Sequence, residues 1–200
     1  MKNENTQPPG KIKIAEAMRA LLSKKSFNEI TTAEIARLAG VTEALIYKYY
    51  KDKRDLLHQI LTEYMKRYLL EGQKEMLGIS GALKKLEKSI WTHINVYATN
   101  RVFARILLLE VRSFPDYYRS RSYKLVKEYS DILLEIIEEG MKNGEIRKDV
   151  SPSFLRQVIL GSIEHVCLTD VVFDREINPD QRTEDLCRFI FQGISGRKRK

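Results

Sequence analysis

The chain has 200 residues, of which 43% are hydrophobic, enough to bury the core of one large domain or two small ones. Its formal charge is +8, no apolar run approaches the ~18 residues of a membrane span, and the N-terminus lacks the apolar core of a signal peptide. Two cysteines, Cys167 and Cys187, are too few for a disulfide scaffold, so we expect a cytoplasmic protein.

Positive charge is concentrated at the two ends of the chain. Residues 1–54 contain 11 Lys and Arg against 6 Asp and Glu, and the last four residues, Arg197 to Lys200, are all basic. A basic N-terminal region is what a protein needs to contact nucleic-acid phosphates. The basic C-terminal run is typical of a solvated tail, and its role stays open.

The N-terminal pattern predicts three short helices. The first is expected at about residues 11–25, where apolar residues recur at helical spacing. Thr31 then stands three residues before Glu34, the spacing of a capping box at a helix start. Gly40 follows where a helix end favours positive φ, and Thr42 is expected to cap the next helix. Two helices joined by a short glycine-containing turn form a helix-turn-helix, whose second helix enters a DNA major groove.

Six longer helices are expected in the rest of the chain, separated by breaks that contain Gly, Asn or Pro. Their approximate ranges are 54–77, 82–99, 102–112, 116–143, 152–173 and 179–193. No strand pattern of any length is present. We therefore predict an all-α fold of about nine helices, with a helix-turn-helix domain in residues 1–53 and a second helical domain in residues 54–200.

The first quarter of the chain resembles a known family at many positions of fixed spacing. The matching residues are Ile14, Ala17, Leu21, Leu22, Phe27, Thr31, Thr32, Ile35, Ala36, Ala39, Gly40, Val41, Ile46, Tyr47, Tyr49, Tyr50, Lys53, Asp55, Leu56 and Leu57. On these residues the chain resembles the N-terminal domain of the tetracycline-repressor (TetR) family of bacterial transcription regulators. One departure is Ser26, where the family usually has glycine. A residue with a Cβ there must bear left-handed strain or end the first helix differently.

The resemblance implies a set of DNA contacts. The residues are Thr31, Thr32, Thr42, Glu43, Ala44, Leu45, Tyr47, Lys48, Tyr49 and Lys53. Hydroxyl groups and the ammonium of Lys53 are expected at phosphates, where they fix the position of the protein without reading sequence. The side chains of Glu43, Ala44, Leu45 and Lys48 are expected to face base edges. For Tyr49, packing in the core is an alternative that stays open.

The resemblance implies that residues 54–200 form a helical effector-binding and dimerisation domain. This part of the chain mixes aromatic and cationic residues in the region where the family builds its ligand pocket. Inward stripes of the predicted helices suggest a lining of Ile90, Ile94, Tyr97, Ile106, Tyr129 and Ile136. Arg105 and Arg112 lie seven residues apart on one predicted helix, hence on one side of it. They are expected either to bind an anionic head group at the pocket mouth or to be solvated surface residues.

A second, narrower resemblance concerns the effector. Residues 136–146 and 161–165 resemble the fatty-acid-metabolism branch of the family, which responds to acyl-CoA. A hydrophobic or amphipathic effector, such as a fatty acyl-CoA, is therefore expected. No cofactor and no metal ion are expected.

Helix 152–173 is apolar on more than one side, which predicts burial against its own domain and against a second subunit. The expected dimer residues are Val158, Gly161, His165, Val166 and Phe189. A catalytic role for His165 with Cys167 is not expected, because residues two apart on a helix point away from each other.

These observations predict a ligand-responsive repressor that binds a pseudo-palindromic operator in double-stranded DNA as a homodimer and works at the nucleoid. The resemblance implies that effector binding swings helix 54–77 and changes the spacing of the recognition helices. The alternative is a ligand-independent, architectural helix-turn-helix protein, and a small helical enzyme would need a catalytic constellation that the sequence lacks. The operator and regulated genes, the effector, and repression versus activation are left open by the sequence.

Overall fold

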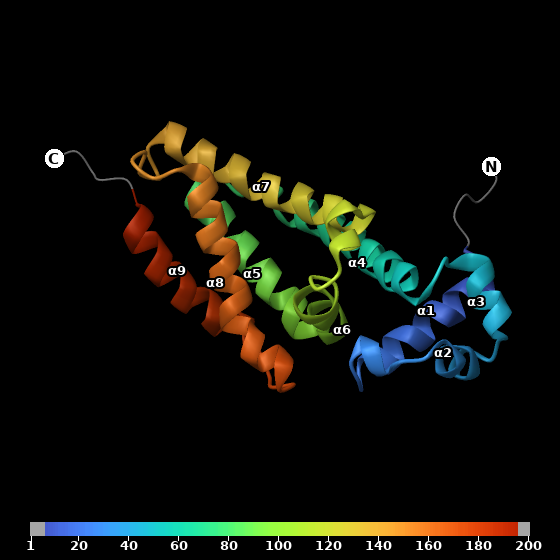
Figure 1. The fold of residues 1–200 in the computed structure, drawn as a ribbon. Coiled ribbons are helices and arrows are strands. Elements are labelled where there is room, and N and C mark those ends of the chain that lie inside the picture. The colour runs from blue at the N-terminus through green and yellow to red at the C-terminus, as the bar shows by residue number, and fades with distance from the viewer. Residues whose placement is uncertain (1–6, 196–200) are drawn as a thin grey trace.

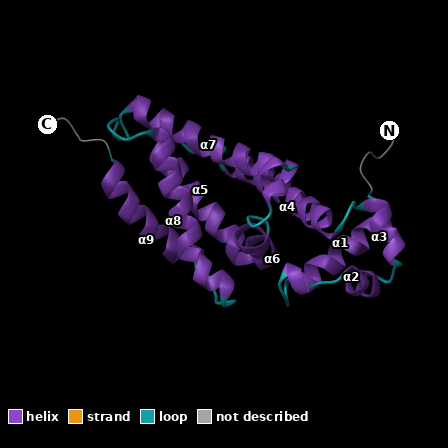
Figure 2. Ribbon diagram, viewed as in Figure 1, coloured by secondary structure: helices purple, strands orange, loops and turns teal. Residues whose placement is uncertain are grey.

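A computed structural model of the chain describes residues 7–195, so the basic tail from Arg197 to Lys200 lies outside the described residues. Within this range the chain forms nine α-helices joined by loops and short helical turns, with no strand (Figure 2). The predicted all-α fold is confirmed. None of the described helices is long and apolar enough to cross a membrane.

The first three helices gather at one end of the molecule (Figure 1). They are α1 (Pro9–Leu22), α2 (Thr32–Ala39) and α3 (Glu43–Tyr49), and they share a small core with the 3-10 helix η1 (Phe27–Glu29). Buried members of this core are Ile14, Met18, Leu22, Phe27, Ile30, Ile35 and Ile46.

Ser26 explains how α1 ends without glycine. The helix stops at Leu22, earlier than the predicted residue 25, and Ser26 has an extended backbone with φ −70°. Ser26 is the N-cap of η1, where its hydroxyl and backbone N–H both donate to the carboxylate of Glu29. No left-handed residue is needed between α1 and η1, so the departure from the family pattern costs no backbone strain.

Six helices form the rest of the described chain. They are α4 (Lys53–Glu75), α5 (Ala82–Thr99), α6 (Arg101–Arg105), α7 (Arg121–Asn143), α8 (Pro152–Val172) and α9 (Pro179–Ile194). Helix α4 starts beside the three N-terminal helices and runs along α7, while α8 and α9 lie side by side at the opposite end (Figure 1). Helix α5 is central, because α7, α8 and α9 all pack against it.

The predicted helix at residues 102–112 is present over residues 101–110, but only its first half is α-helical. Helix α6 ends at Arg105 and continues as a π-helical turn, η2 (Ile106–Glu110), closed by a hydrogen bond from the Val111 N–H to the Ile106 carbonyl at 3.1 Å. The wider turn places the buried carboxylate of Glu110 against the backbone of η1. Apolar periodicity does not reveal such a turn, because residues 106–109 are all apolar and their pattern does not distinguish one type of helix from another.

The predicted start of the next helix at residue 116 is also wrong. Residues Pro115–Arg119 form a separate 3-10 helix, η3, and α7 begins only at Arg121. The boundary is set by Ser120, which has an extended backbone and accepts a hydrogen bond from the Tyr123 N–H at 3.1 Å.

Candidate DNA-binding surface and effector cavity

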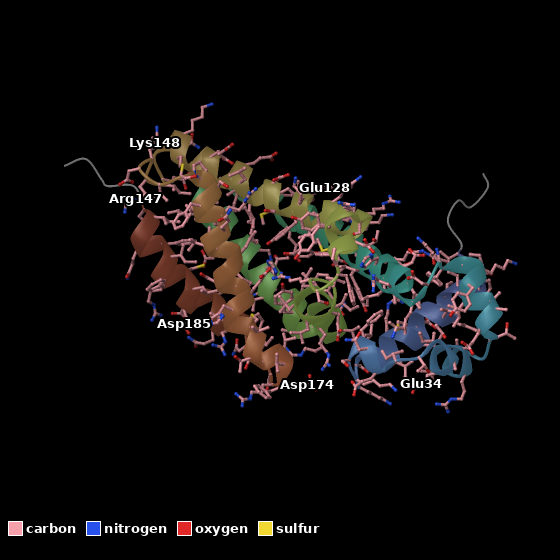
Figure 3. The ribbon with its side chains drawn as sticks, in the orientation of Figure 1. Glu34, Glu128, Arg147, Lys148, Asp174 and Asp185 are labelled. Atoms are coloured by element: carbon pink, nitrogen blue, oxygen red, sulfur yellow. The ribbon has the colours of Figure 1, made fainter. Side chains whose placement is uncertain are left out.

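The start of α2 is fixed by the predicted capping box. The Glu34 N–H donates to the Thr31 hydroxyl at 3.2 Å, and the Thr31 N–H donates to the Glu34 carboxylate at 2.9 Å. Glu34, labelled in Figure 3, also accepts from Lys25 at 2.5 Å, and chiefly this bond lowers the pKa of Glu34 to about 2. Gly40 ends α2 with φ +65°, as expected of a left-handed cap. Thr31 therefore has a structural role at this helix start.

Helix α3 presents one outward face. Glu43, Ala44, Tyr47 and Lys48 are all exposed, and their spacing puts them on the same side of the helix. Thr42 precedes them at the N-cap position, as expected, but its side chain makes no capping hydrogen bond. Its exposed hydroxyl is consequently not used to close the helix.

Two of the predicted DNA contacts are bonded to each other. The Thr32 hydroxyl, near the start of α2, donates to the carboxylate of Glu43 at 2.7 Å. This bond links the two helices of the helix-turn-helix across the turn. It also fixes the direction of the Glu43 side chain on the outward face of α3.

Leu45 and Tyr49 lie one turn apart on the inner side of α3. Both are partly buried against the hydrophobic core. Leu45 Cδ2 lies 3.0 Å from where a Cβ on Gly10 would stand, which shows how closely the leucine approaches α1. Leu45 thus differs from the expected base contact, because its side chain packs against α1. Tyr49 packs against the core, which is the alternative to a DNA contact that the sequence left open.

Lys53 has a role that the sequence pattern did not indicate. Its ammonium donates to the carbonyls of Phe27 at 2.9 Å and Ile30 at 2.6 Å, and lies 4.3 Å from the centre of the Phe27 ring. Partial burial lowers its pKa from the ordinary value. Lys53 therefore joins the start of α4 to η1, whereas the neighbouring Lys51 is exposed.

Two mainly apolar cavities lie between α4, α5 and α7, and a more polar pocket of about 120 Å³ lies between α4, α5 and α6. The larger cavity, of about 280 Å³, is lined by Tyr68, Leu69, Gly72, Gln73, Met76, Ser89, Thr92, Tyr129, Ile132 and Glu135. The smaller cavity, of about 130 Å³, is lined by Met65, Tyr68, His93, Phe103, Leu107, Tyr123, Val126, Lys127, Tyr129, Ser130, Leu160 and Glu164. Both linings are mainly apolar, and both include residues of α4, α5 and α7.

Of the predicted lining residues, only Tyr129 borders these cavities. Four others, Ile90, Ile94, Tyr97 and Ile106, are completely buried by packing, and Ile136 is 7% exposed. The lining that sequence reasoning missed comes from α4, including Tyr68 and Gly72. The sequence does carry a signal for this lining, in the apolar stripe of α4 that contains Tyr64 and Tyr68.

Arg105 and Arg112 do not share one helix side, because η2 separates them. The guanidinium of Arg112 forms two hydrogen bonds to the carboxylate of Glu164, at 2.8 and 2.6 Å. Arg105 is partly exposed and borders neither cavity. A head group would have to compete with Glu164 for Arg112.

The predicted dimer residues lie on one side of the molecule. Val158 is 38% exposed, Gly161 and His165 are exposed along the same stripe of α8, and Phe189 on α9 is 82% exposed. Val166 is half-buried and packs against the core. Phe154, one turn before Val158 on α8, is exposed as well. Several exposed apolar side chains on neighbouring helices are typical of a surface that is covered in an assembled protein.

The geometry of the N-terminal helices agrees with comparisons of the sequence. A family model described as "Bacterial regulatory proteins, tetR family" matches residues 14–60. Another, described as "YsiA-like protein, C-terminal region", matches residues 61–193, which is more than half of the chain. The chain belongs to the TetR family. It is therefore a DNA-binding transcriptional regulator of a ligand-responsive type.

Within the TetR family, the chain is similar to regulators whose names refer to fatty acids. The fatty acid metabolism regulator protein of Bacillus subtilis (strain 168) is 26% identical over 186 residues, covering 93% of this chain and 96% of the relative. The structure of FadR from Bacillus subtilis in complex with stearoyl-CoA is similar with a TM-score of 0.82 and 26% identity, covering 92% of this chain and 98% of that one. The fatty acid degradation regulator FadR from Bacillus halodurans, 22% identical, shares the fold with a TM-score of 0.84 over 96% of this chain and all of that one.

Proposed function

We propose that the protein is a repressor that binds a pseudo-palindromic operator as a homodimer and is released from it by a fatty acyl-CoA or a similar amphipathic anion. The observation that carries the proposal is the pair of apolar cavities beside α4, the helix that leads into the helix-turn-helix. A ligand-independent architectural protein has no need of such cavities, which disfavours that alternative.

The DNA contacts proposed are those that the structure leaves on the outer surface. Glu43, Ala44 and Lys48 face base edges, while the hydroxyls of Thr42 and Tyr47 meet phosphates. Thr32 shares in this surface through its bond to Glu43. Lys53 contributes by holding η1 against α4, and the exposed Lys51 beside it supplies the cationic phosphate contact.

The dimer follows from the exposed apolar side of α8 and α9. Two copies of this surface, each with Val158, Gly161, His165 and Phe189, are proposed to meet around a two-fold axis. The two-fold axis places two recognition helices on two half-sites of one operator. Stable homodimers of this kind bury on the order of 2,000 Å² or more.

The effector class rests on the apolar cavities and on the relatives. The name of the B. subtilis relative links it to fatty acid metabolism, and the similar structure of FadR from B. subtilis is a complex with stearoyl-CoA. Binding of such a ligand next to α4 is proposed to tilt this helix and change the spacing of the recognition helices. Ligand and operator then weaken each other's binding by the same factor.

The proposal is tested by adding stearoyl-CoA to the complex of the protein with an operator isolated by selection from random DNA. We expect release of the DNA, followed by fluorescence anisotropy, and a rise in the melting temperature of the free protein. Coenzyme A without the acyl chain is the matched control and should do neither. If stearoyl-CoA leaves both the complex and the melting temperature unchanged, the proposed effector class is wrong.

A further inference from the structure

Tyr68 and Tyr129 form the wall between the two cavities. Both residues border the larger cavity, and both border the smaller one. Their rings are 4.9 Å apart between centroids and inclined by 48°. A ligand that occupied both cavities would therefore have to displace at least one of these two rings.

A hydrogen bond to His93 helps to hold this wall in place. The Tyr129 hydroxyl lies 3.1 Å from Nδ1 of His93, whose ring packs edge-on against Tyr129 at 5.3 Å between centroids. Burial lowers the pKa of His93 to about 4, so the imidazole is neutral near pH 7. The buried Tyr68 hydroxyl makes no hydrogen bond of standard length, but, after burial itself, its interaction with the Tyr129 hydroxyl shifts the pKa of both tyrosines. Moving Tyr129 aside therefore costs the neutral bond to His93, a weaker contact with the Tyr68 hydroxyl and some ring packing.

The sizes of the cavities indicate that they act together. At about 280 and 130 Å³, neither reaches the ~300–1,000 Å³ that is typical of a small-molecule pocket. Joined through the position of the Tyr129 ring, they would form one larger apolar chamber. An apolar chamber of this kind suits an aliphatic chain.

The charged residues that border the smaller cavity differ from those that border the larger one. Lys127 borders the smaller cavity, and the one carboxylate there, Glu164, is neutralised by Arg112. Glu135 borders the larger cavity. The outer groove that adjoins it between α4 and α7 also carries Lys66, Glu128 and Asp131, of which Asp131 pairs with Arg156. Glu128 is labelled on α7 in Figure 3. An anionic head group is therefore favoured at the Lys127 end and disfavoured at the other.

We propose that Tyr129, held by His93, is a gate that sets the chain length of the effector. The head group lies at the Lys127 end, short chains stay in the smaller cavity, and longer chains displace the Tyr129 ring and enter the larger cavity. This inference rests on the proposed effector class, a fatty acyl-CoA or a similar anion. It adds the direction in which the ligand lies and the residue that selects its length.

Gly72 offers a way to block the far end without disturbing the fold. It borders the larger cavity on α4, and a Cβ added there would meet no atom within 4 Å. A leucine at this helical position fits sterically and favours the helix. Its side chain would occupy space that the end of a long chain needs.

The test measures direct binding of octanoyl-CoA and stearoyl-CoA by calorimetry, without DNA. Gly72→Leu should lower the affinity for stearoyl-CoA about tenfold or more, because two or more methylene groups of the acyl chain lose their burial. The affinity for octanoyl-CoA should be unchanged. Lys74→Leu adds the same side chain to the exposed side of α4 and should change neither affinity. Tyr129→Phe removes the bond that closes the gate and should strengthen stearoyl-CoA binding about fivefold without affecting octanoyl-CoA.

Melting curves without ligand show which variants are folded. Equal effects of Gly72→Leu on both chain lengths, or no effect on either, would overturn the gate, as would a protein that binds neither ligand. If the chain-length pattern is seen but stearoyl-CoA does not release the operator, the gate stands and the proposed repressor mechanism fails. If stearoyl-CoA releases the operator and the variants bind both ligands like the wild type, the proposed function stands and the gate fails.

Discussion

The carboxylate of Glu110 accepts a hydrogen bond from the backbone N–H of Phe27 at 3.2 Å, across 83 positions of the sequence. Glu110 ends the π-helical turn η2, and Leu107 in the same turn borders the smaller cavity. Phe27 is the first residue of η1, and its carbonyl oxygen accepts a hydrogen bond from Lys53 at the start of α4. One short turn therefore touches both the cavity and the helix-turn-helix.

From this contact we predict that Glu110→Leu weakens the coupling between ligand and operator. The Phe27 N–H loses its acceptor, so a shift of η2 caused by the ligand is no longer passed to η1. Coupling between sites is typically ~5–150-fold in affinity, and we expect the effect of stearoyl-CoA on operator affinity to fall several-fold.

The measurement is the operator dissociation constant with and without stearoyl-CoA. Glu110→Gln keeps an acceptor oxygen and should retain the coupling. Wild-type coupling in a folded Glu110→Leu protein would contradict this role.

Lys51 and Lys53 should have separable effects. Lys53→Ala leaves the carbonyls of Phe27 and Ile30 without their charged donor, so we expect a loss of roughly 1–3 kcal/mol in the free energy of unfolding. Its effect on the salt dependence of DNA binding should be small. Lys51→Ala should leave stability unchanged and lower the slope of log affinity against log salt by about one per site. Urea unfolding and binding at several salt concentrations test both. If Lys53→Ala instead lowered the salt slope and left stability unchanged, Lys53 would be the residue that contacts the phosphate.

Glu43 should influence which operators are bound. Its carboxylate lies on the outward face of α3 and can accept a hydrogen bond from cytosine, so Glu43→Gln should change the preferred base at one position in each half-site by ~1–3 kcal/mol. Thr32→Val removes the bond that directs Glu43 and should relax the same position without creating a new preference. Selection from a random DNA library measures both. Identical selected sequences for all three proteins would place Glu43 away from the bases.

A charge on the exposed side of α8 and α9 should prevent dimerisation. Val158→Glu and Phe189→Glu put a carboxylate where the proposed two-fold contact buries apolar surface, so we expect monomers in sedimentation at micromolar concentration and much weaker operator binding. Leu70→Glu is the control, because Leu70 is 59% exposed in the groove between α4 and α7, outside this surface. A dimer of unchanged stability in both α8 and α9 variants would rule out this interface.

The sequence predicted those features that depend on local chemistry. The capping box of Thr31 and Glu34, the left-handed Gly40 and the order of the helices follow from contacts between near neighbours, and the structure confirms them. Thr42 stands at the N-cap position, as its residue type indicates, but its hydroxyl makes no capping bond. Residue type thus fixed where α3 begins and not which hydrogen bonds form there.

The sequence did not predict features that depend on how helices pack. Inward stripes correctly marked Ile90 and Ile94 as buried, but a stripe cannot show where packing leaves a void, and the cavities opened instead beside α4. The turn η2 and the bonds of Lys53 and Arg112 join segments far apart in the chain. Such pairings depend on the assembled fold, since either cation alone is equally compatible with a phosphate, a head group or a solvated surface.

The most direct test of the account is the affinity of stearoyl-CoA for the protein alone and for the protein saturated with its operator. A repressor whose effector and operator favour different arrangements of α4 must show the same coupling factor from either side. We predict that the operator weakens stearoyl-CoA binding by the factor with which stearoyl-CoA weakens operator binding. Equal affinity of stearoyl-CoA for free and operator-bound protein would contradict the account, because a ligand with no preference between the two states cannot release the DNA.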